Sequence, residues 1–590
     1  VGAYIGMTGD EVEEYITQIA FSGATEFLEK YKDKTTDDQM IGHFGLGFYS
    51  AFMVADEVHI DTLSYKDGAT AVHWTCDGGT EYDMQDGDRT TPGTEITLFL
   101  NEESLEFCNE YRMREVIEKY CSFMPVPIFL DNAAEGPQYE TIEKDQLTDK
   151  DTIIETIVEE AKTEEKENEN GEKETVEVSP AKEKYKILKR PVALNDVSPL
   201  WNKHPNECTE EEYKEFYRKV FMDYKEPLFW IHLNMDYPFN LKGILYFPKI
   251  NTEYDSLEGT IKLYNNQVFI ADNIKEVIPE FLMLLKGVID CPDLPLNVSR
   301  SALQNDGFVK KISDYITKKV ADKLTGMCKT DRETYEKYWD DIAPFIKFGC
   351  LKDQKFAEKM DDYIIYKNLD GKYLTLKDCM DKAKEEGHEN QIYYVTNEKE
   401  QSQYINMFKA NGQDAIIMSH SIDNPFISQE EQKHENLKFL RIDADVNDTL
   451  REEVKEEDKE ALKKQEETLT ETFKKALGDD KLQVKVEKLK DAEISSMITL
   501  SEETRRMQDM MKMYNMGMDA SMFGGSGQVL VLNANNKLVQ YVLEHTDGEN
   551  TPKICEQLYD LAQLSHGSLT PERMTKFIAR SNEIMGMMLN

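Results

Sequence analysis

An acidic segment interrupts this 590-residue chain and most constrains how it can fold. Residues 151–180 carry eleven acidic residues, three lysines, one proline and no aromatic residue. Such a composition buries too little apolar surface to offset the entropy lost on ordering. We therefore predict an acidic flexible linker over 133–184, with folded regions on either side. A solvated linker is the favoured interpretation, and a binding segment is the alternative.

The regions around the linker predict a multidomain chain of mixed α/β and α+β classes. Residues 1–132 alternate helical and strand-like runs, which predicts one α/β domain. Residues 185–446 predict a middle domain of two α/β lobes joined by helices, with one strand over 261–269 and a helix over 280–288. Residues 447–590 predict an α+β domain. Its last helix, from Pro571, has an apolar face that packs on the same chain or on a second copy.

The overall charge restricts the partners of the chain. Lys and Arg number 70 against 113 Asp and Glu, a net charge of −43, which argues against nucleic acid or an anionic membrane as a partner. No run of about 18 apolar residues is present. The nine cysteines include no Cys-x-x-Cys pair, which indicates reduced thiols, and the ten histidines lack metal-type spacing. We expect a cytoplasmic protein without a metal site of its own.

A glycine run is the first candidate binding motif. Gly42, Gly45 and Gly47 precede a run predicted as helix over 48–55. Glycines at this spacing allow backbone N–H groups to approach phosphate oxygens, and a helix N-terminus adds a positive dipole end. The run lacks the Gly-Lys-Ser/Thr ending of a P-loop, and a plain chain reversal has the same pattern. The run therefore suggests a nucleotide without identifying the kind of site.

A second candidate motif lies near residue 300. Pro295 disfavours helix, and a helix capped by Asn297 or Ser299 places Arg300 and Gln304 one turn apart on the same face. Arginine there suits a terminal phosphate, and glutamine can orient a water molecule. The alternative is a surface helix start held by an ion pair.

Together, the segments 42–50 and 279–304 resemble the heat shock protein 90 family. Further motifs of the family occur in the family's order: Gly6-Met-Thr8, Ile19–Gly23, Thr91–Thr94, Leu200-Trp201, Ile261–Tyr264 and Gln267–Ile270. The end of the chain, Met-Gly-Met-Met-Leu-Asn590, is similar to the bacterial branch rather than to relatives that end in a Met-Glu-Glu-Val-Asp-like tail.

The resemblance implies an ATP-dependent molecular chaperone, an ATPase that works as a homodimer on non-native client proteins. It implies a GHKL-type (Bergerat-type) α/β sandwich at residues 1–132, a middle domain with a catalytic arginine, and C-terminal dimerisation through 447–590. ATP and Mg²⁺ are the implied cofactors. Closure of the two N-domains would gate hydrolysis.

The resemblance also implies roles for single residues. Gly6, Met7 and Thr94 would lie at the adenine, and Ser22 and Gly23 near the ribose and phosphates, at the start of a lid over 19–40. Arg300 would sense the γ-phosphate, with Gln304 beside it. The phosphates would be wrapped by the run Gly42, His43, Phe44, Gly45, Leu46, Gly47 and Phe48.

The chain departs from the family pattern at its start. Gly2 stands where the family has the aspartate that binds the adenine amino group, and Tyr4 replaces a glycine. Tyr15 stands where some relatives have asparagine. The general-base glutamate and the Mg²⁺-binding asparagine of the family would precede Val1. We therefore expect an N-terminally truncated chain, with residues 1–132 marginally folded and ATP hydrolysis weak or absent.

A methionine-rich segment is the candidate client-binding element. Flexible thioether side chains suit adaptable apolar surfaces, and the nearby glycines favour a mobile element over ordinary core, which is the alternative. The candidate residues are Met511, Met516, Met518, Met522 and Phe523.

Three functions compete for this sequence. A sensor kinase or DNA topoisomerase-type ATPase would use the same pocket, but no histidine helix precedes the domain and no basic stripe is present. An ATP-independent holdase differs from the chaperone ATPase only in whether ATP turns over.

Overall fold

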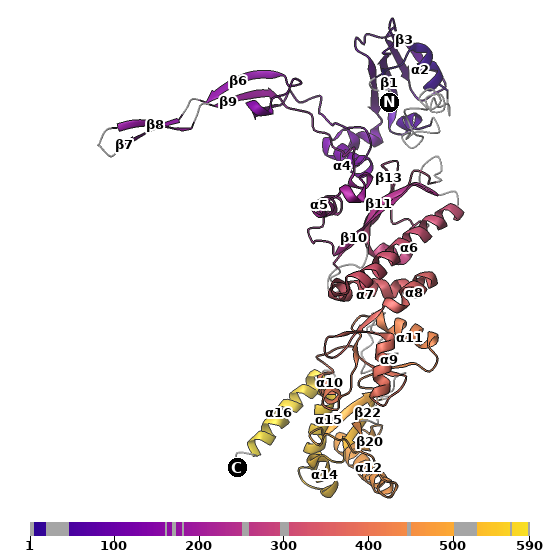
Figure 1. Ribbon diagram of the computed structural model, residues 1–590, viewed down its shortest axis with the longest axis vertical. Coiled ribbons are helices and arrows are strands. Elements are labelled where there is room, and N and C mark those ends of the chain that lie inside the picture. The colour runs from indigo at the N-terminus through magenta and orange to yellow at the C-terminus, as the bar shows by residue number, and fades with distance from the viewer. Residues whose placement is uncertain are drawn as a thin grey trace. The chain divides into compact units, whose positions relative to one another are not determined.

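The computed structural model describes residues 5–18, 46–159, 162–167, 173–179, 182–249, 259–275, 277–294, 306–444, 450–500, 528–566 and 569–587. The chain divides into two compact units (Figure 1). The first comprises Val1–Lys249, Glu258–Pro279 and Leu285–Asp314, and the second comprises the remaining residues. None of the helices in the described part is both long and apolar enough to cross a bilayer. All nine cysteines are unpaired.

The N-terminal sheet is antiparallel, in the order β3-β2-β1-β4. One face of its middle strands is buried because alternate residues of β1, among them Val58 and Ile60, pack against Val12 of α2. A capping box between Thr8 and Glu11 starts that helix. The elements of this region are α2 (Gly9–Tyr15), η2 (Phe48–Met53), β1 (Ala55–Leu63), β2 (Val72–Cys76), β3 (Asp83–Asp86), β4 (Gly93–Leu100), η3 (Glu102–Cys108) and α4 (Glu110–Cys121).

The acidic segment differs from the flexible linker predicted for 133–184, because its described residues form strands. Strands β5, β9 and β6 make a three-stranded antiparallel sheet, and β7 pairs with β8. Ile142 and Ile187 are the apolar side chains of this sheet that the structure describes as buried. Both lie outside the acidic residues 151–180. The guanidinium of Arg190 donates two hydrogen bonds to the Asp151 carboxylate, from Nε at 2.8 Å and from Nη2 at 2.6 Å. The elements are β5 (Tyr139–Glu143), η4 (Lys144–Gln146), β6 (Ile153–Glu159), β7 (Lys162–Glu167), β8 (Lys173–Ser179) and β9 (Lys182–Leu188).

A five-stranded mixed sheet, in the order β10-β11-β14-β12-β13, forms the next part of the first unit. Strands β12 and β14 run parallel, and the other pairs are antiparallel. The elements are η5 (Leu200–Asn202), η6 (Pro205–Glu207), α5 (Glu210–Phe221), β10 (Phe229–Met235), β11 (Leu241–Phe247), β12 (Ile261–Asn265), β13 (Val268–Asp272) and β14 (Lys286–Asp290).

Two predictions for this part were wrong. The single strand predicted over 261–269 is a hairpin, because Asn266 and Gln267 adopt left-handed φ angles of 50° and 62°, which suit a two-residue turn. The helix predicted over 280–288 is a short 3₁₀ helix, η7 (Glu280–Leu284), followed by β14. A short apolar run does not by itself distinguish a helix from a buried strand, and sheet pairing decided this one.

The second unit contains the smaller α/β lobe that was predicted. A two-stranded sheet pairs β15 with β16, and a parallel sheet has the order β18-β17-β19. Helix α6 (Asp306–Thr330) spans the boundary between the units. The other elements are α7 (Arg332–Lys352), α8 (Gln354–Met360), η8 (Asp361–Tyr363), β15 (Ile365–Lys367), β16 (Tyr373–Thr375), α9 (Leu376–Glu385), β17 (Gln391–Val395), α10 (Ser402–Ala410), β18 (Ile416–Ile417), α11 (Asp423–Lys433) and β19 (Lys438–Arg441).

The C-terminal part of this unit is α+β, with a sheet in the order β20-β22-β21. Helix α12 ends at Leu477 because Gly478, its C-cap, adopts a left-handed φ of 66°. The core joins Phe473 of α12, Leu530 of β22 and Leu558 of α15. The elements are α12 (Glu456–Leu477), β20 (Gln483–Glu487), β21 (Ser496–Leu500), β22 (Gln528–Asn533), α14 (Lys537–Glu544), α15 (Thr551–His566) and α16 (Pro571–Met587).

Candidate functional site

Gly6 places the start of the candidate nucleotide site against the end of β1. Its φ is +60°, and a Cβ atom added there would lie 1.7 Å from the carbonyl oxygen of Leu63. The neighbouring backbone is held by the N–H group of Tyr65, which donates to the carbonyl of Ile5 at 2.7 Å. Only glycine fits this close approach without strain.

Three hydrogen-bonding groups meet beside Gly6. The N–H group of Met7 donates to Thr62 Oγ1 at 2.9 Å, and Thr62 Oγ1 lies 2.8 Å from Thr94 Oγ1. The register of β1 and β4 sets Thr62 directly opposite Thr94. Thr62 is fully buried, whereas Thr94 is half-buried. We call Gly6, Met7, Thr62 and Thr94 the threonine nook.

The structure therefore brings together three of the residues predicted at the adenine: Gly6, Met7 and Thr94. Sequence reasoning missed Thr62, which connects them. The available signal was the alternation of β1, in which a threonine continues the buried series begun by Val58 and Ile60. A polar residue in a buried series indicates a hydrogen-bonded partner.

The end of the glycine run is Leu46, Gly47 and Phe48. The helix predicted over 48–55 is instead the 3₁₀ helix η2, and the chain enters β1 at Ala55. The ring of Phe48 packs edge-on against Trp74 at 5.9 Å and belongs to the hydrophobic core under the sheet. Core packing thus accounts for Phe48, while Gly47 begins η2 without a side-chain cap.

The other predicted site residues lie outside the described part of the chain, so their roles stay predictions. They are Ser22, Gly23, Gly42, His43, Phe44 and Gly45 of the nucleotide site, Arg300 and Gln304 of the catalytic motif, and Met511, Met516, Met518, Met522 and Phe523 of the client segment.

The strand that leads toward Arg300 ends in a buried acid, Asp290. Its Oδ2 atom accepts hydrogen bonds from Trp201 Nε1 at 3.2 Å and from the N–H group of Gln267 at 3.0 Å. Its Oδ1 atom is buried with no hydrogen-bond partner among the described residues. Burial raises the pKa of the Asp290 carboxyl to about 6. No feature of the sequence around 290 had indicated this environment.

Trp201 anchors an aromatic cluster around this acid. Its ring lies 4.7 Å from Phe123 and 5.3 Å from Tyr264, measured between ring centroids. The side-chain amide of Gln267 also donates to the carbonyl of Phe123 at 2.6 Å. Phe123, which falls within the predicted 1–132 domain, thus packs in the core of the five-stranded sheet.

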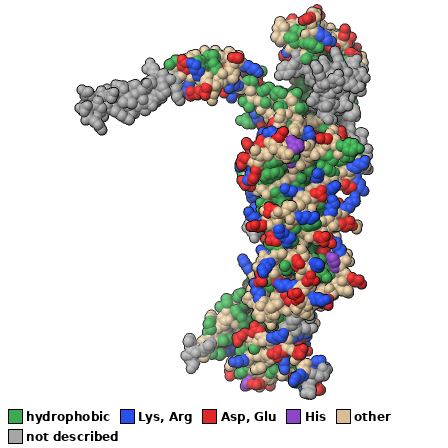
Figure 2. All heavy atoms as spheres, viewed as in Figure 1, with side chains coloured by type: hydrophobic (Ala, Val, Ile, Leu, Met, Phe, Trp, Pro, Cys, Tyr) green, Lys and Arg blue, Asp and Glu red, His purple; other side chains and the backbone are tan. Residues whose placement is uncertain are grey.

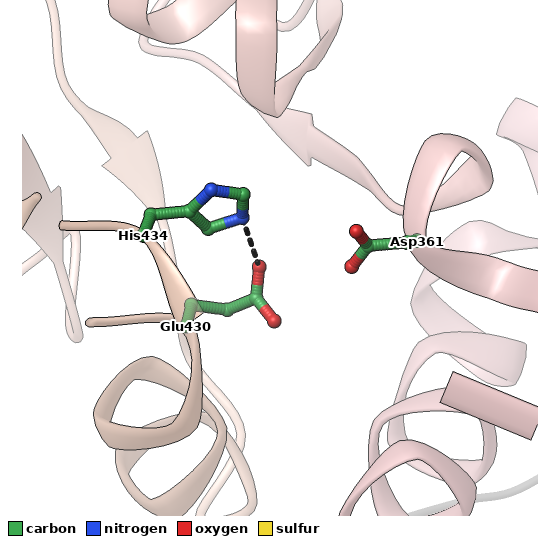
Figure 3. Close-up of side chains that lie close together, drawn as sticks. All are labelled: Asp361, Glu430 and His434. Atoms are coloured by element: carbon green, nitrogen blue, oxygen red, sulfur yellow. Dashed lines mark ion pairs between the residues drawn. The ribbon is translucent and has the colours of Figure 1, made fainter. Parts of the chain in front are cut away.

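Asp361, Glu430 and His434 form the cluster that most resembles a metal site among the described residues (Figure 3). A lysine already supplies positive charge there, because Lys433 Nζ lies 3.3 Å from Asp361 Oδ1 and 2.9 Å from Glu430 Oε1. Burial tends to lower the pKa of Lys433, but its hydrogen bond to Glu430 and the nearby acids raise it, which keeps the lysine charged. We interpret the cluster as an ion-pair network.

Comparison with known proteins gives one family. The Hsp90 protein family model matches residues 106–590. The chain is 41% identical over 564 residues to chaperone protein HtpG of Bacteroides thetaiotaomicron, covering 93% of this chain and 75% of that protein. It is 38% identical over 574 residues to the Porphyromonas gingivalis protein of the same name, covering 95% and 76%. For Borreliella afzelii the identity is 30% over 592 residues, covering 98% and 87%.

Proposed function

Because this chain belongs to the Hsp90 protein family, we propose that it is a molecular chaperone whose action on non-native proteins is driven by ATP and a dimeric clamp cycle. Members of this family are ATPases that use ATP with Mg²⁺. The threonine nook is the observation that best supports a nucleotide site in this chain. The unpaired cysteines support a reducing compartment such as the cytoplasm.

The nook fits the edge of a purine base. The backbone of Gly6 and Met7 is pinned close to β1, and the half-buried hydroxyl of Thr94 lies beside it. Hydroxyls both donate and accept hydrogen bonds, which suits a base carrying both types of group. The end of the glycine run and Arg300 would hold the phosphates, and bound ATP would supply a γ-phosphate whose hydrolysis resets the clamp.

The base anchor proposed for this chain is weaker than that of the family, because Gly2 cannot accept the hydrogen bond of an aspartate. Weak affinity for ATP follows from this difference. An ATP-independent holdase is therefore the alternative function.

A titration with a fluorescent ATP analogue in the presence of Mg²⁺ tests the site. We expect Thr94→Val to weaken binding by about tenfold, the effect of one lost hydrogen bond. Thr97→Val is the matched control, since Thr97 lies on the same strand opposite His59 and outside the nook. Equal effects of the two variants, or no effect of either, would contradict the assignment.

Measurement of ATP hydrolysis distinguishes the chaperone ATPase from the ATP-independent holdase. Loss of ATP hydrolysis in Arg300→Ala would support the ATPase, whereas suppression of client aggregation without turnover in the unmodified chain would favour the holdase.

A separate experiment tests the methionine-rich segment by replacing Met511, Met516 and Met518 with serine. The variant should suppress client aggregation less well and stay dimeric. Unchanged suppression would argue against a client role for this segment.

The proposed homodimer forms through the C-terminal helices. Helix α16 exposes Ile578, Met585 and Met587, with fractional exposures of 52%, 56% and 47%. Figure 2 shows hydrophobic side chains gathered near the C-terminal end of the chain. A second copy of the same helix would cover this surface. Serine at Ile578 and Met585 should give a monomer in sedimentation velocity, while the exposed neighbour Asn582→Ser should remain dimeric.

A further inference from the structure

Helix α16 turns a charged residue inward and leaves apolar residues exposed. All of Pro571–Met587 is described, and within it the one buried side chain is that of Arg580, a charged residue. The side opposite to Arg580 carries Ile578 and Met585, which are exposed, while Phe577 is half-buried. A surface helix ordinarily turns its apolar stripe inward and its charges toward water. Apolar burial alone therefore does not account for this orientation, since Ile578 and Met585 stay exposed.

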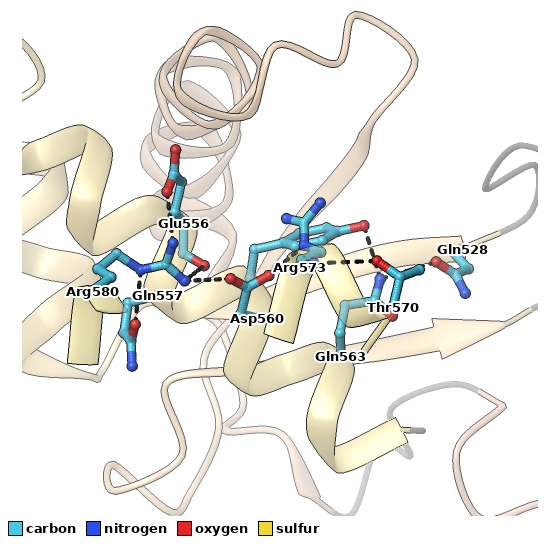
Figure 4. Close-up of polar contacts among 9 residues, drawn as sticks. Gln528, Glu556, Gln557, Asp560, Gln563, Thr570, Arg573 and Arg580 are labelled. Carbon is cyan, nitrogen blue, oxygen red and sulfur yellow. Dashed lines mark hydrogen bonds and ion pairs between the residues drawn. The ribbon is translucent and has the colours of Figure 1, made fainter. Parts of the chain in front are cut away.

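Arg580 is bound by three residues on one face of α15 (Figure 4). Its Nη1 atom donates to Glu556 Oε2 at 2.6 Å and its Nε atom donates to Gln557 Oε1 at 2.8 Å. Its Nη2 atom donates to Asp560 Oδ2 and to the backbone carbonyl of Glu556. The N–H groups of the planar guanidinium thus donate to fixed acceptors on the neighbouring helix.

Asp560 binds a second arginine from the same helix. Arg573 Nε donates to Asp560 Oδ1 at 2.5 Å, and the Arg573 guanidinium lies 4.5 Å from the centre of the Tyr559 ring. The Asp560 side chain is only 2% exposed. Arg573 and Arg580 are seven residues apart, two turns or about 10 Å along α16, so one carboxylate fixes the helix at two points.

We propose that Asp560, with Arg573 and Arg580, is a clasp that sets the rotation of α16 and thereby presents its apolar side to a second copy of this chain. The inference rests on the proposed C-terminal dimer. Ionic hydrogen bonds are directional, whereas apolar contacts tolerate sliding and rotation. Turning α16 by half a revolution would move Ile578 and Met585 toward α15, expose Phe577 instead, and so change the surface offered to a second copy.

The clasp can impose this orientation because its central pair is buried: the side chains of Asp560 and Arg580 are 2% and 7% exposed, whereas that of Arg573 is 39% exposed. Taking away one member of a buried ionic group leaves the remaining charges unpaired, which is much more costly than losing a surface pair. Without Asp560, Arg580 keeps only Glu556 and Gln557 as partners, and the directional contact that joins both arginines to one carboxylate is lost. Helix α16 is then free to rotate on α15. Asp560 is in this sense a positioning residue for assembly.

The test is Asp560→Asn in the full chain, which keeps the side-chain shape and removes the charge. Asp547→Asn is the matched control, because Asp547 is 89% exposed and forms only a 3.5 Å surface pair with Lys475. The dimer dissociation constant is measured by sedimentation equilibrium, and amide hydrogen exchange is followed over α15 and α16.

We expect Asp560→Asn to weaken the dimer by at least about tenfold and to speed amide exchange in α16 by about the same factor, with α15 still protected. The control should change neither. An unmodified chain that stays monomeric at every concentration would contradict the dimer, while the exchange data would still decide whether Asp560 holds α16.

Arg580→Lys provides a second variant that keeps the charge. Lysine cannot reach three acceptors in one plane, so we expect dimer weakening close to that of Asp560→Asn. Unchanged dimerisation and unchanged exchange in both variants would overturn the clasp. Loss of protection throughout α15 as well would show a general packing role instead and would also overturn it.

Discussion

Two sheets of the first unit contrast in how well their strands are covered. In β4 of the N-terminal sheet, Ile96 and Leu98 are 50% and 40% exposed, although their partners in β1, Ile60 and Val58, are fully buried. In β11 of the five-stranded sheet, Ile244 and Leu245 are both fully buried. Strands of similar apolar content therefore contribute very different amounts of buried surface.

The contrast shows where the stability of this region resides. Fully burying one leucine or isoleucine stabilises a fold by about 1.5–3 kcal/mol, and half-exposed side chains contribute correspondingly less. The N-terminal sheet should therefore unfold more readily than the five-stranded sheet. Marginal folding of residues 1–132 stays a prediction, and the exposure of β4 supplies a physical reason for it.

The most damaging change should be Trp201→Ala in η5, which packs against the five-stranded sheet. It removes the centre of the aromatic cluster and the indole donor to Asp290, and we expect a loss of about 3–5 kcal/mol. Urea unfolding followed by circular dichroism measures it. Tyr224→Ala, at an 85% exposed position, is the control. A loss under about 1 kcal/mol would show that the cluster is not the stable centre.

A matched leucine pair tests the contrast directly. Leu245→Ala should cost about 2–5 kcal/mol, because it leaves a cavity in a fully buried strand. Leu98→Ala should cost less than about 1 kcal/mol, since that side chain is already 40% exposed. Similar losses of unfolding free energy in both variants, measured by urea unfolding, would contradict the difference in stability between the two sheets.

Titration of Asp290 should make the unfolding free energy of the five-stranded sheet depend on pH. Burial raises the pKa of this carboxyl from 3.8 to about 6, so the folded state binds its proton more tightly than the unfolded chain does. Its contribution to stability is greatest below pH 4 and is lost as the pH rises to about 6, a change of about 3 kcal/mol.

Asp290→Asn removes this titration. Unfolding free energies of both proteins between pH 4.5 and 7.5 should show the variant gaining on the unmodified chain as the pH rises. The amide oxygen can still accept from Trp201 and Gln267, so the packing is kept. A constant difference across this range would mean that Asp290 titrates at its ordinary pKa.

The smallest global effect is expected from Gly6→Ala in the N-terminal region. A methyl group cannot occupy a point 1.7 Å from the carbonyl oxygen of Leu63, so the segment must detach. Detachment from a marginal region limits the loss to about 1–2 kcal/mol. Hydrogen exchange localised to 5–18 measures it, and Gly68→Ala in an exposed turn controls for the left-handed φ. Equal effects of the two changes would mean that the left-handed φ causes the loss, and not the close contact with Leu63.

Local features of the fold could be predicted because neighbouring residues determine them. The final helix from Pro571 follows from the spacing of its apolar residues. The mixed α/β class follows in the same way, and the nook residues Gly6, Met7 and Thr94 follow from family resemblance.

The amino-acid sequence by itself determined the family, the mixed α/β class and the residue types at the candidate site. Only the tertiary structure decided which residues meet. It set Thr62 between Met7 and Thr94, split 261–272 into a hairpin, made a strand of 286–290 and buried Asp290 beside Trp201. It also turned the charged side of α16 inward. The physical reason is that pairing and burial depend on residues far apart in sequence, which no local pattern records.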